Sequence, residues 1–154
     1  MVTNIVDIVV YRGKAYLPTL GQFPSGIYAA IEPVQVAKLS VDDLVDATKK
    51  ALAQGISQLP EVTAEEWRKR SDPILKATKA RSWKELGPIG TSYGMSWTDQ
   101  NIRVDMSYRD KRGRWQNDPA KERTFPLDTP LEDVLAVILE DIRSQPELQA
   151  SEKA

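Results

Sequence analysis

The residue types available for chemistry in this sequence are limited to carboxylates, lysines, tyrosines and hydroxyls, because it contains no histidine and no cysteine. Histidine general bases, Ser-His-Asp triads and imidazole metal ligands are therefore excluded. Thiolate nucleophiles, disulfides and thiolate zinc sites are excluded as well. The early glycines, Gly13, Gly21 and Gly26, are too scattered for a phosphate loop or a dinucleotide fingerprint. We predict no catalytic residue, no metal ligand and no cofactor.

One acidic group follows Ser40 closely enough to be considered as a cation site. Asp42, Asp43 and Asp46 offer oxygen ligands of the kind that Mg²⁺ and Ca²⁺ prefer. The same residues fall in the first turns of a predicted helix, where negative charge is favoured by the helix dipole, and we favour that interpretation. A hydrolase or nuclease that uses carboxylates and a divalent metal is kept as the alternative function.

A basic cluster with an aromatic neighbour lies further along the chain. It consists of Arg109, Lys111, Arg112, Arg114 and Trp115. Such side chains bind phosphate or stack on a base, so a small nucleic-acid-binding or accessory module is a further alternative. A solvated hairpin turn explains the same residues, and we favour it, with Arg112 and Trp115 retained as candidate partner-binding residues. Trp67, Trp83 and Trp97 are expected to pack in the core or at its edge.

The last predicted helix has an acidic face. Its members are Glu132, Asp133, Glu140 and Asp141, with Glu147 just beyond. A solvated outer face accounts for them by default, and a docking surface for a basic partner is the functional alternative.

Charge is unevenly distributed although the net charge is only −1. Residues 61–125 carry a net charge of +4 and residues 126–154 a net charge of −5. With a pI of about 5.6, the chain lacks the concentrated basic charge of a nucleic-acid binder, so nucleic acid is not the expected partner. The N-terminal apolar stretch is interrupted by Asp7 and reads as a strand, not a signal peptide. With no apolar run near the roughly 20 residues of a membrane span, we expect a cytoplasmic protein.

The first third of the chain predicts strands followed by a helix. Residues 5–11 and 15–17 are rich in β-branched and aromatic residues, and residues 18–26 have the prolines and glycines of a loop. Residues 27–36 read as extended, with a bulge or sheet edge at Pro33. Ser40 is expected to cap a helix over 41–54.

The remaining segments alternate between helical and strand patterns. Capping-box spacing predicts helices from Thr63 and Ser82, with a break or restart at Pro73. Period-two alternation predicts a hairpin of strands at 92–98 and 102–108, with further strands near 114–116 and 123–125. Thr129 and Glu132 have the spacing of a capping box at the start of a helix over 130–144.

These elements together predict an α+β fold, with a single antiparallel sheet and helices packed mainly on one face. Tyr93, Met95 and Trp97 should line the same face of the sheet as Ile102, Val104 and Met106. Residues 1–146 are expected to form one domain and residues 147–154 a polar C-terminal tail.

Three segments carry a resemblance to a known family. They read GKAYLPT at 13–19, GIYAAIEPV at 26–34 and SWKEL at 82–86. On these segments and the order of elements, the chain resembles a bacterial immunity protein of contact-dependent growth inhibition systems. The resemblance implies a cytosolic protein that binds and blocks the toxin domain of a larger exported protein, and such toxins are often nucleases. It implies no individual site residues.

We therefore predict a non-enzymatic, protein-binding inhibitor that neutralises a cognate toxin by occlusion. Two surfaces compete for the toxin: the acidic face of Glu132, Asp133, Glu140 and Asp141, and the hairpin with Arg112 and Trp115. Nuclease active sites attract phosphate and are basic, so an acidic face would complement them and speed association. The sequence slightly favours the acidic face and does not specify an oligomeric state.

Overall fold

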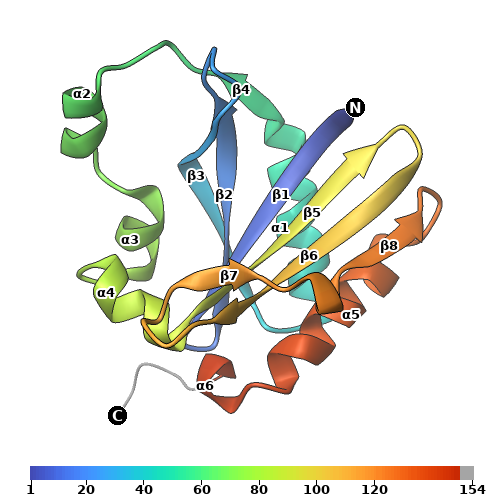
Figure 1. Ribbon diagram of the computed structural model, residues 1–154. Coiled ribbons are helices and arrows are strands. Elements are labelled where there is room, and N and C mark those ends of the chain that lie inside the picture. The colour runs from blue at the N-terminus through green and yellow to red at the C-terminus, as the bar shows by residue number, and fades with distance from the viewer. Residues whose placement is uncertain (150–154) are drawn as a thin grey trace.

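Strand β1, Val2–Tyr11, is paired very differently with its two neighbours in the sheet. The computed structural model, which describes residues 1–149, pairs β1 with β5, Thr91–Thr98, from Val2 through Val10. With β2, Lys14–Gln22, β1 forms only the three residue pairs nearest their connecting turn. Beyond those pairs β1 and β2 diverge, so the sheet divides into two arms (Figure 1).

The two arms together make one eight-stranded sheet with the order β3-β2-β1-β5-β6-β7. The first arm holds β2, β3 (Tyr28–Lys38) and the short β4 (Ile56–Gln58), which is parallel to β2. The second arm holds β1, β5 and β6 (Asn101–Arg109), and β6 pairs with both β7 (Trp115–Asn117) and β8 (Arg123–Pro126). All other pairings are antiparallel. The predicted α+β class is confirmed.

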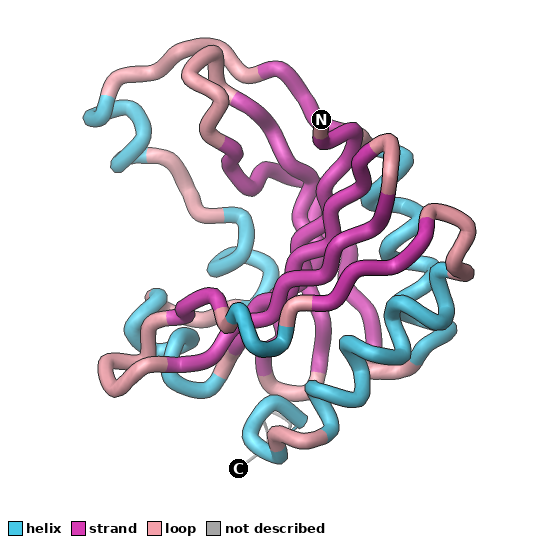
Figure 2. The backbone as a smooth tube through the Cα atoms, turned by 45° about the vertical axis from the view of Figure 1, so that its right-hand side comes forward, coloured by secondary structure: helices cyan, strands magenta, loops and turns pink. Residues whose placement is uncertain are grey.

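The main core lies between the sheet and a layer of three helices. These are α1 (Val41–Gln54), α5 (Leu131–Arg143) and α6 (Pro146–Gln149), seen beside the strands in Figure 2. Alternate residues of β5 and β6 point into this core, including Tyr93, Met95 and Val104. Trp97 packs against its margin. The predicted hairpin, its inward-facing residues and the two long helices are therefore confirmed.

The opposite face of the sheet is covered only in part. A smaller apolar cluster joins Val9 and Tyr11, which alternate with the core residues of β1, to Ile74 and Leu86. Those two residues come from α3 (Pro73–Thr78) and α4 (Trp83–Leu86). Helix α2 (Ala64–Lys69) precedes them, and none of its residues is buried. The 3-10 turns η1 (Gly87–Ile89) and η2 (Pro119–Lys121) complete the described elements.

Helix caps follow the sequence at three sites and depart from it at a fourth. Ser40 and Ser82 accept hydrogen bonds from the third residue beyond them, and Thr63 forms a complete capping box with Glu66. The capping box predicted at Thr129 is wrong, because α5 begins one residue later and is preceded by Pro130 with no side-chain cap.

The loop predicted over residues 18–26 is wrong in its first part, because β2 continues to Gln22 and the connection to β3 begins only after it. Pro18 still pairs with Val34, and the register shifts immediately after it. The shift accommodates two extra residues of β3, Glu32 and Pro33. Proline is tolerated in strands at such irregularities, which explains why the strand survives both prolines.

The chain ends differently from the predicted polar tail. Residues 146–149 form α6, and Leu148 is 0% exposed within the main core. Its carbonyl accepts a hydrogen bond of 2.8 Å from the Gly13 amide at the β1–β2 turn. Residues 147–149 of the predicted tail thus pack on the domain, and its remaining residues, 150–154, lie outside the described residues.

Replacing Leu148 with alanine tests the role of α6. We expect a loss of about 3 kcal/mol in the free energy of unfolding, because the change leaves a cavity in the core. Leu127→Ala is the control, since that side chain is 47% exposed and its loss should change stability by about 0.5 kcal/mol or less. Urea titration followed by tryptophan fluorescence measures both; equal effects would show that α6 does not contribute to the core.

Candidate partner-binding surfaces

The turn between β6 and β7 is organised by Asp110. Its Oδ1 atom accepts hydrogen bonds from the backbone amides of Arg112, at 2.8 Å, and Arg114, at 3.0 Å. The bond from Arg114 is the main reason that the pKa of the Asp110 carboxyl lies below its usual value. With the backbone fixed in this way, the side chains of Lys111, Arg112 and Arg114 are exposed to solvent. The carboxylate thus shapes a turn that presents three cations.

Helix α4 and η1 pack closely against this turn. Trp115 donates a hydrogen bond of 2.9 Å from Nε1 to the Gly87 carbonyl, and its ring meets the Trp83 ring edge to face at 5.3 Å. A Cβ atom on Gly87 would lie 2.7 Å from the Gly113 carbonyl oxygen, so glycine is needed for this approach. The contact brings together tryptophans that are 32 positions apart in sequence.

A hollow of about 670 Å³ results between α4 and the turn, and we call it the basic–aromatic groove. The side chains with charge or aromatic rings that line it are Trp83, Lys84, Arg112, Arg114 and Trp115. Arg112 and Trp115 are thus brought together as the sequence suggested. Trp83 was expected to pack in the core or at its edge, but it is 40% exposed and forms one wall. Arg109 does not join the groove; it binds the Gly90 carbonyl and Glu147.

The predicted acidic face is smaller in the structure than in the sequence. Glu132, Asp133 and Glu140 are exposed on α5. The side chain of Asp141 is only 12% exposed, because it binds three groups of its own protein. Its oxygens lie 2.6 Å from Tyr93 Oη, 2.9 Å from Lys121 Nζ and 3.0 Å from Gln145 Nε2. Asp141 is therefore engaged in joining α5 to β5 and η2.

The Tyr93 hydroxyl, which binds Asp141, is buried. Burial, followed by its hydrogen bond to Asp141, raises the pKa of the Tyr93 phenol far above its usual value. The hydroxyl consequently stays protonated and donates to Asp141. Glu147, the other carboxylate near this face, is paired with Arg109 at 2.9 Å.

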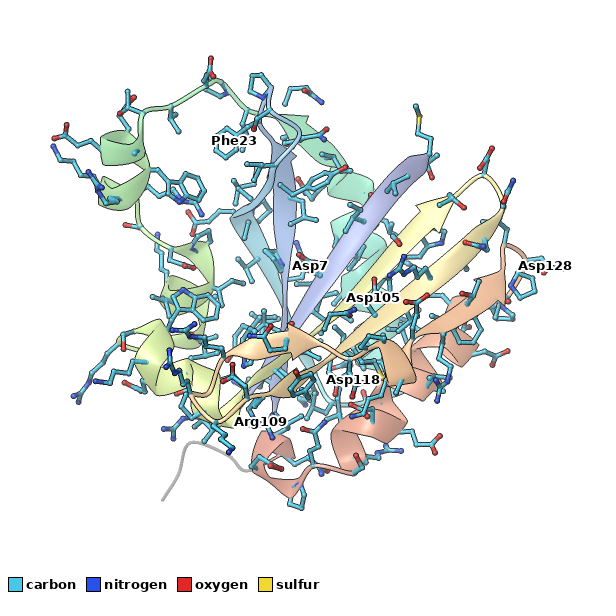
Figure 3. All side chains as sticks on the ribbon, viewed as in Figure 1. Asp7, Phe23, Asp105, Arg109, Asp118 and Asp128 are labelled. Carbon is cyan, nitrogen blue, oxygen red and sulfur yellow. The ribbon has the colours of Figure 1, made fainter. Side chains whose placement is uncertain are left out.

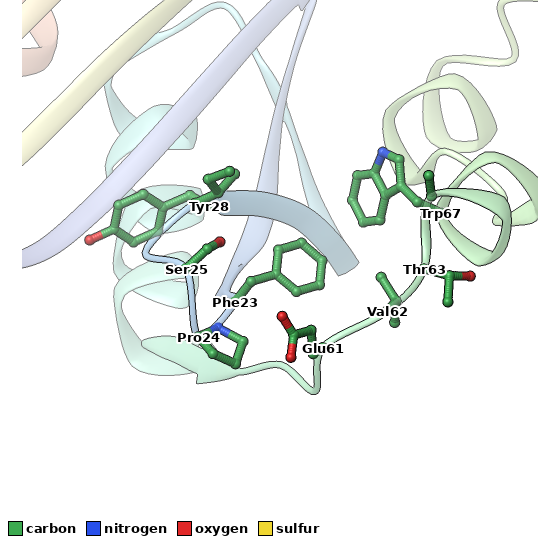
Figure 4. Close-up of a pocket in the computed structure, with 10 residues that line it drawn as sticks. Phe23, Pro24, Ser25, Tyr28, Glu61, Val62, Thr63 and Trp67 are labelled. Carbon is green, nitrogen blue, oxygen red and sulfur yellow. The ribbon is translucent and has the colours of Figure 1, made fainter.

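A second hollow, of about 340 Å³, lies between α2 and the turn from β2 to β3 (Figure 4). We call it the aromatic hollow; its lining includes Phe23, Tyr28, Glu61, Val62 and Trp67. Trp67 is 39% exposed, contrary to the expectation of core or edge packing. Sequence reasoning missed this site. The capping box at Thr63 placed Trp67 on a helix, but no local pattern showed that Phe23 would lie 5.3 Å from its ring.

Asp7 lies on the face of β1 that the main core does not use (Figure 3). Its Oδ1 atom stands 3.7 Å from the place where Gly94 would carry a Cβ atom. Burial raises the pKa of this carboxyl to about 6. In the sequence Asp7 was notable only as an interruption of an apolar stretch.

The three aspartates that follow Ser40 lie in the N-terminal part of helix α1. Asp42 and Asp43 lie in the first turn of α1, and Asp46 pairs with Lys50 at 3.2 Å. Within residues 1–149 no three acidic side chains converge to hold a metal ion. The favoured interpretation, helix-terminal charge, agrees with this placement.

Comparison with known proteins places the fold. No protein-family model and no curated protein matches the chain. Among solved structures, a chain of the CdiA-CT/CdiI toxin and immunity complex from Yersinia pseudotuberculosis is similar with a TM-score of 0.64 at 10% identity, over 92% of this chain and 96% of that one. A protein of unknown function from Neisseria meningitidis is similar with a TM-score of 0.64 at 15% identity, over 91% and 94%. The resemblance found in the sequence is thus confirmed at the level of the fold.

The helices of residues 1–149 are all too short or too polar to cross a membrane.

Asp141→Asn tests the structural role of that carboxylate. We expect the free energy of unfolding to fall by about 2 kcal/mol. Lys121 loses its charged partner, and the buried Tyr93 hydroxyl loses a strong hydrogen-bond acceptor. Glu140→Gln, one residue away and exposed, should change stability by about 0.5 kcal/mol or less. Thermal and urea unfolding measure both variants; an unchanged stability in Asp141→Asn would remove the carboxylate from its structural role.

Asp7→Asn should stabilise the protein in a pH-dependent manner. The folded state holds a proton on Asp7 up to about pH 6, whereas the unfolded chain releases it near 3.8, so this group's contribution falls as pH rises between those values. The neutral variant avoids that loss and should gain up to about 3 kcal/mol at pH 7.5 and nothing at pH 3.5.

Asp105→Asn on β6 is the control for this experiment, because its carboxylate pairs with Arg103 at 3.0 Å. It should show no gain at pH 7.5. Urea unfolding across pH 3.5–8 gives the comparison, and a gain in Asp7→Asn that is independent of pH would contradict the assignment.

Proposed function

We propose that this chain is a cytoplasmic immunity protein, which binds the toxin domain of a larger exported protein and blocks it by occlusion. The observation that carries the proposal is the fold shared, over more than nine-tenths of both chains, with a chain of a toxin and immunity complex. An inhibitor of this kind needs an exposed, preformed surface and no reaction chemistry. The basic–aromatic groove is a surface of this type, and the aromatic hollow is a second exposed one.

We propose the basic–aromatic groove as the main toxin-binding surface, in preference to the acidic face of α5. Tryptophan and arginine are the residues most enriched among those that dominate binding energy at interfaces. The groove offers Trp83 and Trp115 beside Arg112 and Arg114. The acidic face retains three exposed carboxylates, because Asp141 is engaged internally. Its predicted members include no aromatic side chain. Its charge would then act mainly on the rate of association.

One observation favours a second candidate function, the binding of single-stranded nucleic acid. Cations beside two tryptophans are the elements with which proteins hold a phosphate backbone and stack bases. The net charge of −1 opposes this function, so we place it second.

Charge reversal on the two surfaces distinguishes them. In Arg112→Glu/Arg114→Glu, binding to the cognate toxin domain should weaken at least about tenfold, because the two cations that border Trp115 are replaced by anions. Glu132→Lys/Glu140→Lys reverses the same number of charges on α5. It should slow association by less than about threefold, and the effect should diminish at the higher salt concentration. Calorimetry and surface binding kinetics at two salt concentrations give both quantities.

Three outcomes decide among the proposals. Failure of the unaltered protein to bind the toxin domain or to protect cells from it removes the immunity function. A large loss in the α5 variant with none in the groove variant moves the interface to the acidic face. Salt-dependent binding of a poly-uridine oligonucleotide, lost in the groove variant, would favour the nucleic-acid function.

A further inference from the structure

Helix α2 is attached to the rest of the protein by few contacts. It buries none of its residues, and its own bonds are local: the capping box at Thr63 and an ion pair between Glu65 and Lys69 at 3.2 Å. Its link to the sheet runs through Trp67, whose ring meets Phe23 edge to face. Arg70 adds a hydrogen bond of 2.8 Å to the Ala30 carbonyl. Figure 1 shows α2 standing out from the sheet at one side.

Large apolar side chains remain exposed where α2 meets the β2–β3 turn. Ile27 is 65% exposed, and Tyr28, Val62 and Trp67 are each exposed to more than a third of their area. Aromatic rings carry negative potential on their faces and so attract cations. The protein itself uses this property here, since the Arg70 guanidinium lies 3.9 Å from the centre of the Trp67 ring.

Glu61 is the charged member of the hollow's lining. Figure 4 shows its carboxylate beside Phe23, and the residue is exposed to solvent. No cation of residues 1–149 forms an ion pair with Glu61. A lining that combines one carboxylate with three aromatic side chains complements a group that is cationic at its end and apolar along its stem.

We propose that the aromatic hollow binds an arginine or lysine side chain supplied by a protein partner. The apolar stem lies along Phe23 and Tyr28, and the cationic end reaches the Glu61 carboxylate. That the partner is the toxin domain rests on the proposed function. The preference of the hollow for a cation rests only on the residues that line it, and it is tested without any toxin.

Small probes measure this preference directly. N-acetyl-arginine methylamide is titrated into the protein, with the citrulline analogue as a neutral control of nearly the same shape and the norleucine analogue as an apolar control. Tryptophan indole resonances in ¹H–¹⁵N spectra report the position of binding. We expect the arginine probe to shift the Trp67 resonance with a Kd on the order of millimolar. The citrulline and norleucine probes should bind at least about threefold more weakly.

Two variants, each of which removes one negative charge, test whether the Glu61 carboxylate binds the cationic probe. Glu61→Gln should weaken the arginine probe about threefold and leave the citrulline probe unchanged. Glu65→Gln, on the neighbouring helix α2 but outside the hollow's lining, should change neither. Equal binding of the arginine and norleucine probes, equal effects of the two variants, or no shift of Trp67 would each overturn the cation assignment. None of these results bears on whether the toxin domain binds, so the two proposals fail separately.

Discussion

The unequal pairing of β1 is the constraint on which the rest of the structure depends. Because β1 follows β5 along its length but leaves β2 after three residue pairs, the sheet has two arms joined at one hairpin. A split sheet needs something to hold its arms together, and α1 does so by packing against β1, β2 and β3 while also contacting α5. The α6 contact to Gly13 closes the structure at the hairpin itself. Each arm then extends from a fixed base.

Both hollows lie on the α2–α4 side of this frame, away from the main core. The basic–aromatic groove is shaped by two internal contacts: Asp110 binds the backbone of the turn, and Gly87 lies close to Gly113. The aromatic hollow has one wall on a strand turn and the other on α2, which has no buried residue. A preformed surface and a loosely attached one suit different parts of one interface, since the first lowers the entropic cost of binding and the second adapts to the partner.

Periodicity made the main core predictable, and long-range contacts limited the prediction of the sites. The alternation of Tyr93 and Met95 and the stripe on residues 131–142 specify buried faces on their own, so the hairpin and both long helices were anticipated. Leu148 looked like part of a polar tail because it packs in a core built from distant segments, and its carbonyl binds Gly13, 135 positions earlier in the sequence. Asp141 looked like a surface charge for the same reason, its partners being Tyr93 and Lys121. Phe23 and Trp67 meet only because α2 returns to the β2–β3 turn.

The position of α2 outside the core has a consequence for how such a protein changes over generations. Substitutions at Glu61 or Val62 would change the lining of the proposed binding surface while leaving the main core intact, so they carry a small penalty in folding free energy. Under the proposed function, a few surface replacements of this kind would change the partner without passing through an unstable intermediate.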